Sequence, residues 1–309
     1  MNSANWYSNK TIPPCWTGRA FFCNHNRKED LTVKTLKQLL FAAAVLLSAC
    51  ICADNPAVVF RYPDRTITAI QEQAMMMPGS LFHSSSEKLQ LRKAYPASCN
   101  VFLMTLKDGT RCLIDAGFGK GLFRQLRELQ IPRESISAVF ITHIHPDHVG
   151  GLIDADGAEA FPKAKIYISR KEYEAWKKDT ARARMAGCLE PYSGRIVLLE
   201  YDKEVQPYGL TPLDYSGHTP GHTVYRIGNR NEYFVGDIVH AVDLQVSHFS
   251  YCARYDMNPR RAAASRKEML LQRGIWYGAH IPYPGKIEIV REILKGGKNL
   301  FSYSLPKEK

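Results

Sequence analysis

Three histidines and an aspartate lie close together in the stretch FITHIHPDHVGG, residues 140–151. His143 and His145 are two positions apart, directly after an apolar run, where the chain is expected to be extended. Side chains at i and i+2 of an extended chain point to the same face, so the two imidazoles should project together. Asp147 and His148 are expected to follow in a turn. Imidazole nitrogens and carboxylate oxygens suit borderline metals such as zinc, so this stretch predicts half of a metal site.

Three motifs further along the chain carry the same types of ligand. His222 lies in SGHTPGHT, Asp237 ends EYFVGD, and His280 ends IWYGAH. Each follows an apolar run or a glycine-rich turn, where a polar side chain can leave a buried strand. One ion with an open position needs about three protein ligands, so this larger set predicts two ions. A polar loop after a buried strand would explain one such histidine, but it does not explain all four motifs in this order.

Strands and helices must position these motifs, and the chain alternates between the two at suitable lengths. Short β-rich runs at residues 99–106 and 111–115 flank an Asp-Gly turn and predict a hairpin. Leucines at helical spacing predict a helix over residues 121–130. Further strands are expected at SAVFIT, KIYIS, RIVLLE, HTVYRIG, EYFVGD and IWYGAH, and further helices at residues 171–178 and after Asn258, the expected N-cap, with Pro259 at the first helical position. This order predicts a layered α/β protein with sheets inside and helices outside.

Residues 34–53 have the layout of a secretory signal. Two lysines precede an apolar run that small residues end. The run is too short for a comfortable membrane span, which needs roughly twenty residues. The letters LSAC resemble a bacterial lipobox and predict lipidation at Cys50, with cleavage after Ala53 and a buried core helix as the alternatives. We therefore expect an exported periplasmic protein or outer-membrane lipoprotein of a bacterium, preceded by a disordered or wrongly assigned extension at residues 1–33.

Charge and cysteine content narrow the class of protein further. The net charge of +11 is spread along the chain, without a dense basic run or a nucleic-acid motif, so no nucleic-acid partner is expected. Membrane contact is expected only through the signal or a lipid anchor. None of the eight cysteines forms a C-x-x-C pair, which argues against a cysteine zinc site. Export would permit disulfides among Cys99, Cys112, Cys188 and Cys252, but their spacing does not reveal the pairing.

Together, THIHPDHVGG, GHTPGHT, GD and GAH, preceded by LIDAG, resemble the metallo-β-lactamase superfamily from about residue 67 onwards. The resemblance implies a four-layered αβ/βα sandwich, with metals in a cleft at one edge of two sheets and a hydrolase domain spanning residues 54–309. His218 falls outside the ligand pattern and is expected to shape its loop, and Asp115 of LIDAG to support the site from outside the ligand set. The implied ligands are His143, His145 and His222 for one ion, Asp147, His148 and His280 for the other, and Asp237 as the bridge.

The same resemblance implies hydrolysis of a small molecule with two divalent ions, zinc being favoured over manganese and iron. A water between two such ions loses its proton near neutral pH and attacks an ester, a lactone or a related electrophile. Asp147 is expected both to bind metal and to transfer a proton. His240 takes the place of a tyrosine that quorum-quenching lactonases often carry, and it is expected to hydrogen-bond the substrate.

The sequence indicates a metal-dependent hydrolase more clearly than it indicates the branch of the superfamily. An aspartate at position 237 argues against antibiotic hydrolysis, and the short tail after His280 leaves no room for the helical extension of glyoxalase II. The lactonase and organophosphate-hydrolase branch fits best, with apolar substrate walls expected in loops at residues 75–83 and 248–251. The alternatives are hydrolysis of a phosphotriester or β-lactam, and a metal-binding envelope protein without turnover.

Overall fold

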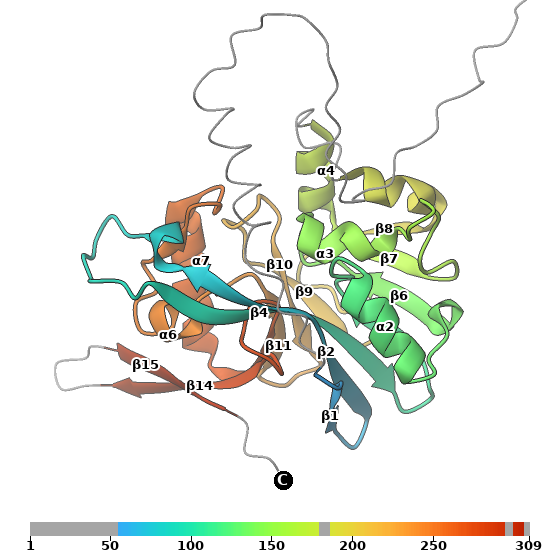
Figure 1. Cartoon of the computed structure of the whole chain (residues 1–309), viewed down its shortest axis with the longest axis horizontal. Coiled ribbons are helices and arrows are strands. Elements are labelled where there is room, and N and C mark those ends of the chain that lie inside the picture. Colours follow the sequence, from blue (N-terminus) through green and yellow to red (C-terminus); the bar gives the residue numbers. More distant parts are fainter. Residues whose placement is uncertain (1–54, 179–185, 294–298, 306–309) are drawn as a thin grey trace, which may run out of the picture.

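Two mixed β-sheets lie face to face in the centre of the molecule, with helices on both outer sides (Figure 1). The computed structural model describes residues 55–178, 186–293 and 299–305. The expected extension and secretory signal, residues 1–33 and 34–53, lie outside this part of the chain.

The first sheet has seven strands in the order β1-β2-β4-β5-β6-β7-β8. Its first four strands pair antiparallel, and β5 to β8 pair parallel. The parallel half matters for the site, because parallel strands end at the same edge of a sheet. The strands are β1 (Val58–Arg61), β2 (Arg65–Pro78), β4 (Ala94–Leu106), β5 (Arg111–Ile114), β6 (Ile136–Phe140), β7 (Lys165–Ser169) and β8 (Ile196–Leu199).

The second sheet has six strands in the order β15-β14-β13-β11-β10-β9. Only β11 and β13 pair parallel in it. A third, two-stranded sheet pairs β3 (Phe82–His83) with β12 (Cys252–Ala253). The six strands are β9 (Leu210–Asp214), β10 (Thr223–Ile227), β11 (Glu232–Gly236), β13 (Gly274–Gly278), β14 (Lys286–Ile293) and β15 (Asn299–Ser304).

Alternating side chains of the strands form the layers. On β4, Phe102 and Met104 face the core between the two sheets, whereas Val101 and Leu103 face the outer helices. This follows from the two-residue period of a strand, and both faces read as apolar because both are covered. Full burial of a side chain such as Phe102 contributes about 1.5–3 kcal/mol.

Helices cover the outer face of each sheet. Leu122 and Leu126 of α2 (Lys120–Glu128) and Trp176 of α4 (Arg170–Lys178) pack against the first sheet. Met269 and Leu270 of α7 (Pro259–Gln272) pack against the second, near the short α6 (Val242–Gln245). The four layers are therefore helix, sheet, sheet and helix, which confirms the predicted αβ/βα sandwich.

The local signals predicted several elements correctly. The hairpin is β4–β5, the leucine-spaced helix is α2, and the side chain of Asn258 accepts a hydrogen bond from the Arg261 backbone N–H at 3.0 Å. The turn expected at Asp147 and His148 is instead a single helical turn, α3 (Pro146–Val149). It forms because the carbonyl of His145 accepts from the backbone N–H groups of His148 and Val149.

Two further observations concern cysteines and membrane spans. Cys99, Cys112, Cys188 and Cys252 are all buried, and no disulfide joins any two of these four residues, although export would permit one. Within the described ranges, no helix combines the length and hydropathy needed to cross a membrane.

Candidate metal centre

The polar motifs converge because they follow strands that end at one edge of the two sheets. His143 and His145 come directly after β6. Asp237 follows β11 and His280 follows β13, and these two strands pair parallel, so both side chains leave the second sheet at the same end. His148 lies on α3, which continues the chain after β6. The site therefore takes ligand-type residues from both sheets.

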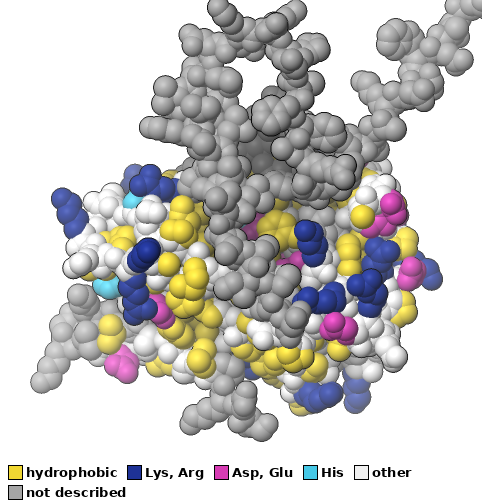
Figure 2. Space-filling model, viewed as in Figure 1, with side chains coloured by type: hydrophobic (Ala, Val, Ile, Leu, Met, Phe, Trp, Pro, Cys, Tyr) yellow, Lys and Arg dark blue, Asp and Glu magenta, His cyan; other side chains and the backbone are white. Residues whose placement is uncertain are grey.

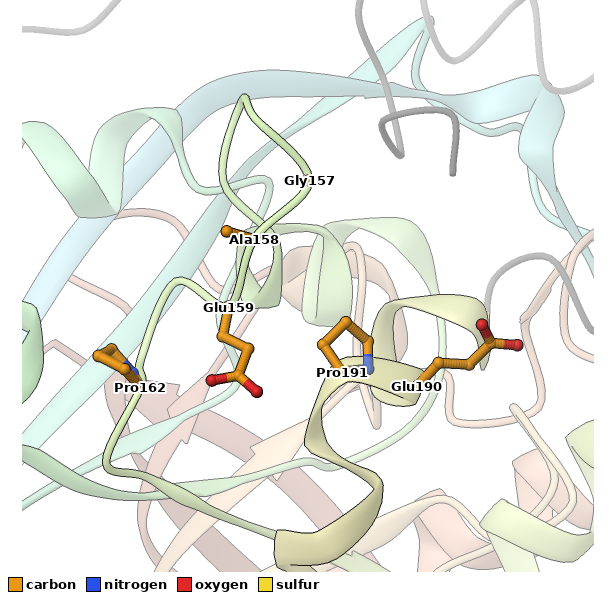
Figure 3. A pocket seen from close by; sticks show the side chains of 6 residues that line it. All are labelled: Gly157, Ala158, Glu159, Pro162, Glu190 and Pro191. Carbon is orange, nitrogen blue, oxygen red and sulfur yellow. The ribbon is translucent and has the colours of Figure 1, made fainter. Parts of the chain in front are cut away.

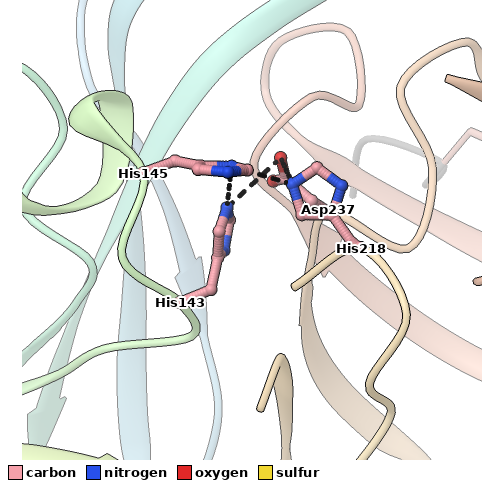
Figure 4. Close-up of side chains that lie close together, drawn as sticks. All are labelled: His143, His145, His218 and Asp237. Atoms are coloured by element: carbon pink, nitrogen blue, oxygen red, sulfur yellow. Dashed lines mark hydrogen bonds and ion pairs between the residues drawn. The ribbon is translucent and has the colours of Figure 1, made fainter. Parts of the chain in front are cut away.

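One group of ligand atoms joins the two halves of the fold (Figure 4). His143 Nε2 lies 2.9 Å from His145 Nδ1, which lies 3.0 Å from His218 Nε2. Asp237 Oδ2 lies 3.2 Å from His218 Nε2 and 3.7 Å from His143 Nε2. All four ligand atoms lie within 4.8 Å of one another, close enough to share one ion.

A second group lies on the other side of Asp237. Asp147, His148 and His280 each offer one ligand atom within 4.8 Å of the others. His280 Nε2 lies 3.3 Å from Asp147 Oδ2 and 3.1 Å from Asp237 Oδ2, and His148 Nε2 lies 3.1 Å from Asp237 Oδ1. Asp237, for which the family resemblance implied a bridging role, thus lies between the two groups.

In three of these imidazoles the ring nitrogen that faces away from the centre, Nδ1, has a hydrogen-bond acceptor beside it. This acceptor determines which ring nitrogen carries the proton in the neutral imidazole. His148 Nδ1 lies 2.7 Å from Asp115 Oδ2, His280 Nδ1 lies 2.8 Å from the Ser98 carbonyl, and His218 Nδ1 lies 2.8 Å from Asp256 Oδ1. Each partner is an acceptor, so each Nδ1 carries a proton, and a metal ion that displaces the proton from Nε2 would find the lone pair of that nitrogen facing the centre. Asp115, which was expected to support the site from outside the ligand set, contacts His148 in this way.

The centre therefore brings basic ring nitrogens and carboxylates face to face. His148 Nε2 and Asp237 Oδ1 are buried, lie 3.1 Å apart, and have no hydrogen-bond partner among the described residues. Burial lowers the pKa of His148, but the carboxylates of Asp237, Asp115 and Asp147 outweigh it and raise the pKa above its usual range, so either a proton or a metal ion can lie between these two atoms. Several imidazoles with two carboxylates form a donor set that suits a divalent metal ion, so the residues present fit the metals that the family implies.

His222 lies outside both groups of ligand atoms, contrary to the ligand set predicted from the sequence. Its Nε2 accepts a hydrogen bond from the Asp237 backbone N–H at 2.9 Å, so its lone pair is already used. Burial, followed by the neighbouring His218, lowers the pKa of His222 to about 3, which keeps this nitrogen an acceptor at neutral pH. His222 thus positions the backbone of Asp237.

His218 belongs to the first group of ligand atoms, although the sequence did not predict it as a ligand. Burial lowers its pKa, but hydrogen bonds with Asp237 and Asp256 outweigh burial and raise the pKa to about 9. Asp256 was missed by sequence reasoning. Its side chain is completely buried, and its Oδ2 lies 3.6 Å from Arg266 Nη2. Its only sequence signal is an aspartate two positions before the N-cap of α7, too common a pattern to single it out.

His240 is buried beside the second group. Its Nε2 lies 3.1 Å from Asp237 Oδ2, and its ring stacks on His280 at 5.0 Å and 24°. Its Nδ1 has no hydrogen-bond partner in the described part of the chain, unlike the outer nitrogens of His148, His218 and His280. The tautomer of His240 is therefore not set by an acceptor, which distinguishes it from those three rings.

The two stretches expected as substrate walls differ in their placement. Met75 to Met77 belong to strand β2 and not to a loop, because they pair with Tyr95 to Ala97 of β4. Met77 still reaches the site, since its sulfur lies 3.9 Å from the Tyr255 hydroxyl, and the Tyr255 ring lies 4.9 Å from that of His240. In residues 248–251, His248 and Ser250 instead bind Glu87, away from the ligand groups.

A surface hollow of about 580 Å³ lies elsewhere on the molecule (Figure 3). Its lining includes no residue of either ligand group. The lining residues are Gly157, Ala158, Glu159, Pro162, Glu190 and Pro191. On the face shown in Figure 2, lysine and arginine side chains are interspersed with apolar and acidic ones, as the spread of charge along the sequence predicts.

Comparison with known proteins places this geometry in a family. The model of the metallo-beta-lactamase superfamily matches residues 94–294. A hydroxyacylglutathione hydrolase of Synechococcus sp. (strain JA-2-3B'a(2-13)) is 26% identical over 132 residues, which cover 43% of this chain and 45% of that protein. The anti-Pycsar protein Apyc1 of Bacillus phage BSP38 is 43% identical over 53 residues, or 17% of this chain and 20% of that protein. The chain thus spans less than half the length of these relatives.

Solved structures show the same fold. The hydrolase AbOPH of the β-lactamase superfamily superposes with a TM-score of 0.71 at 23% identity, covering 82% of this chain and 98% of that one. AidC, a dizinc quorum-quenching lactonase in complex with its product, superposes with a TM-score of 0.70 at 20% identity and the same coverage. Because the family model covers well over half of its residues, this chain belongs to the metallo-beta-lactamase superfamily.

Proposed function

We propose that this protein is a hydrolase that uses two divalent metal ions, zinc being favoured, to cleave an ester or lactone bond of a small molecule. The observation that carries the proposal is the placement of Asp237. Its carboxylate lies 3.1–3.2 Å from Nε2 of His148, His218 and His280, and at each of these nitrogens the outer ring atom is held by an acceptor.

The geometry supports the following division of ligands. His143, His145 and His218 would hold one ion, with His218 replacing His222 of the sequence-based set. Asp147, His148 and His280 would hold the other, and Asp237 would contact both. When bound, the ions would supply Lewis acidity that polarises a carbonyl oxygen and lowers the pKa of water.

The side chains around the centre would bind and transfer protons. The side chain of Asp147 is 21% exposed, whereas that of Asp237 is 3% exposed, so Asp147 is the ligand-group carboxylate with access to solvent. We assign to Asp147 the acceptance and return of a proton during the reaction. We retain His240 as a substrate hydrogen-bonding candidate, because its Nδ1 lacks a partner among the described residues.

The preference for esters and lactones rests on similarity. The relatives include hydroxyacylglutathione hydrolases, and the structural neighbours include a lactonase bound to N-hexanoyl-homoserine. Those activities belong to those proteins. The proposal carries over only the class of bond. Tyr255, whose ring lies 5.8 Å from that of His218 and whose hydroxyl contacts the Met77 sulfur, is a candidate for contact with the substrate.

A panel of chromogenic substrates tests the proposal. The purified protein is loaded with zinc, assayed on esters, lactones, phosphotriesters and a β-lactam, then stripped with chelator and reloaded. We expect ester or lactone turnover that chelator abolishes and zinc restores. Retention of metal without turnover of any bond class would instead favour a non-catalytic metal-binding protein.

We also propose that the protein is exported and held at a bacterial membrane through lipidated Cys50. The support is the sequence alone: two lysines, an apolar run and LSAC within residues 34–53.

A further inference from the structure

Glu172 is a buried carboxylate that neither ligand group uses. It lies in the first turn of α4 and is completely buried. Its Oε1 accepts from the Ile144 backbone N–H at 2.9 Å and from Trp176 Nε1 at 2.6 Å. Its Oε2 accepts from the Thr219 hydroxyl at 2.9 Å and from the Gly221 backbone N–H at 2.8 Å.

The partners of Glu172 come from the two loops that bring ligands together from the two sheets. Ile144 lies between His143 and His145, in the loop after β6 of the first sheet. Thr219 directly follows His218, in the loop before β10 of the second sheet. One carboxylate thus joins the segments that supply the three histidines of the first ligand group.

The contacts suit a carboxylate in particular. Two backbone N–H groups and an indole N–H can only donate, and the Thr219 hydroxyl also donates here. An ionised carboxylate is acceptor-only and receives all four bonds, whereas an amide would turn an NH₂ group towards at least one backbone donor. A buried donor left unpaired costs about 1–3 kcal/mol.

A glycine allows the close approach that these bonds need. A Cβ added at Gly221 would lie 2.2 Å from the backbone nitrogen of Glu172. The start of α4 therefore rests directly on the backbone of the second loop. The Ser169 hydroxyl fastens the same contact by donating to the Gly221 carbonyl at 2.9 Å.

We propose that Glu172 is a positioning residue for the metal centre: its carboxylate holds the two loops in the relation that lets His143, His145 and His218 converge. Trp176 extends this support, because its ring lies edge-on to His145 at 5.7 Å and 90°. The inference rests on the proposed metal-dependent function and adds to it a residue that touches neither ion nor substrate.

Zinc affinity, measured by competition with a chromophoric chelator at neutral pH, tests this role alongside thermal unfolding of the metal-free protein. We expect Glu172→Gln to bind zinc about 10–100-fold more weakly, the usual cost of losing support behind metal ligands. Thr219→Val removes one of the four donors and should weaken zinc binding in the same direction by a smaller factor.

Two control variants separate positioning from general stability. Glu72 is another carboxylate that accepts backbone N–H groups, those of Gly119, Gly121 and Leu122 at the start of α2, and these partners include neither Ile144 nor Thr219. Glu72→Gln should lower the unfolding temperature but keep zinc affinity. Glu174 lies half-exposed on the same helix as Glu172, so Glu174→Gln should change neither quantity.

The outcomes are distinguishable. Wild-type protein that binds no zinc contradicts the proposed function itself. If wild type binds zinc and Glu172→Gln binds it equally well, or if Glu72→Gln loses as much affinity, the positioning role is wrong. Should Glu172→Gln fail to fold, Thr219→Val decides: weaker zinc binding supports the role, and unchanged binding overturns it.

Discussion

Two loops each bring a pair of histidines to the centre, and they use them differently. In the loop after β6, His143 and His145 both direct a ring nitrogen to the same ligand group. In the loop between β9 and β10, only His218 does so, and His222 accepts a hydrogen bond from the backbone of Asp237. His143 and His145 therefore belong to the same ligand group. Of the other pair, His218 belongs to that group, and His222 holds the backbone of Asp237.

The difference follows from the backbone. His143 and His145 belong to a chain that leaves β6 extended, where a spacing of two places side chains on one face. His218 and His222 are separated by Thr219, Pro220 and Gly221 in an irregular loop, where spacing alone carries no direction. The shared direction of two histidines can therefore be predicted from the sequence where the chain runs extended after a strand, but not in a glycine-containing turn.

The largest effect is expected at the residue both loops meet. Asp237→Asn keeps the backbone N–H that donates to His222 but removes the charge that faces five imidazoles. Since losing mere support for a ligand costs about 10–100-fold, losing the bridge should cost more than 100-fold in turnover. Elemental analysis and rate measurements check this, and near-normal values for both would remove Asp237 from the bridging position.

Substitution by glutamine should have a large effect at His218 and a small effect at His222, although both residues lie in the loop between β9 and β10. His218→Gln removes a ligand nitrogen, so we expect weaker metal retention and a large loss of turnover. His222→Gln offers a carbonyl oxygen that can accept from the Asp237 N–H, so most activity should remain. Zinc content and kcat measured for both variants compare the two positions directly, and the reverse ranking would restore His222 as the ligand.

A smaller effect is expected behind His218. Asp256 Oδ1 lies 2.8 Å from His218 Nδ1 and keeps the proton on that nitrogen. Asp256→Asn replaces this charged acceptor by a weaker, neutral one. Zinc affinity should fall by about 10–100-fold, less than for His218→Gln. Chelator competition measures the loss, and an affinity equal to that of wild type would mean that the loop alone orients this ring.

The smallest effect on the centre is expected from a change in the secretory signal. Cys50→Ala should leave turnover unchanged and release the protein from the membrane fraction, because lipidation at this position is the proposed anchor. Cell fractionation with labelled fatty acid measures the change. A wild-type protein without label, beginning at Asp54, would mean ordinary secretion, and one that keeps residues 34–50 in the cytoplasm would contradict export.

The sequence predicted the candidate ligands that follow regular strands. Apolar runs ending in His143, Asp237 and His280 predicted strands that deliver ligands to one edge, and the structure has them at β6, β11 and β13. The residues that sequence reasoning missed, Glu172 and Asp256, act through contacts between distant segments. Glu172 meets Gly221 across 49 positions, and nothing local in EYEAW marks it as more than a helix surface residue.

The division of the centre between two sheets also has a kinetic consequence. His143 and His280 lie 280 − 143 = 137 positions apart, and each of the two proposed ligand groups takes residues from both sheets. Either proposed group can therefore bind an ion with all its ligands only after the two sheets have docked, when the slow, non-local part of folding is over. Interactions formed after the transition state slow unfolding and leave the folding rate nearly unchanged. A metal bound here would therefore slow unfolding of the native state and would leave the rate of folding nearly unchanged.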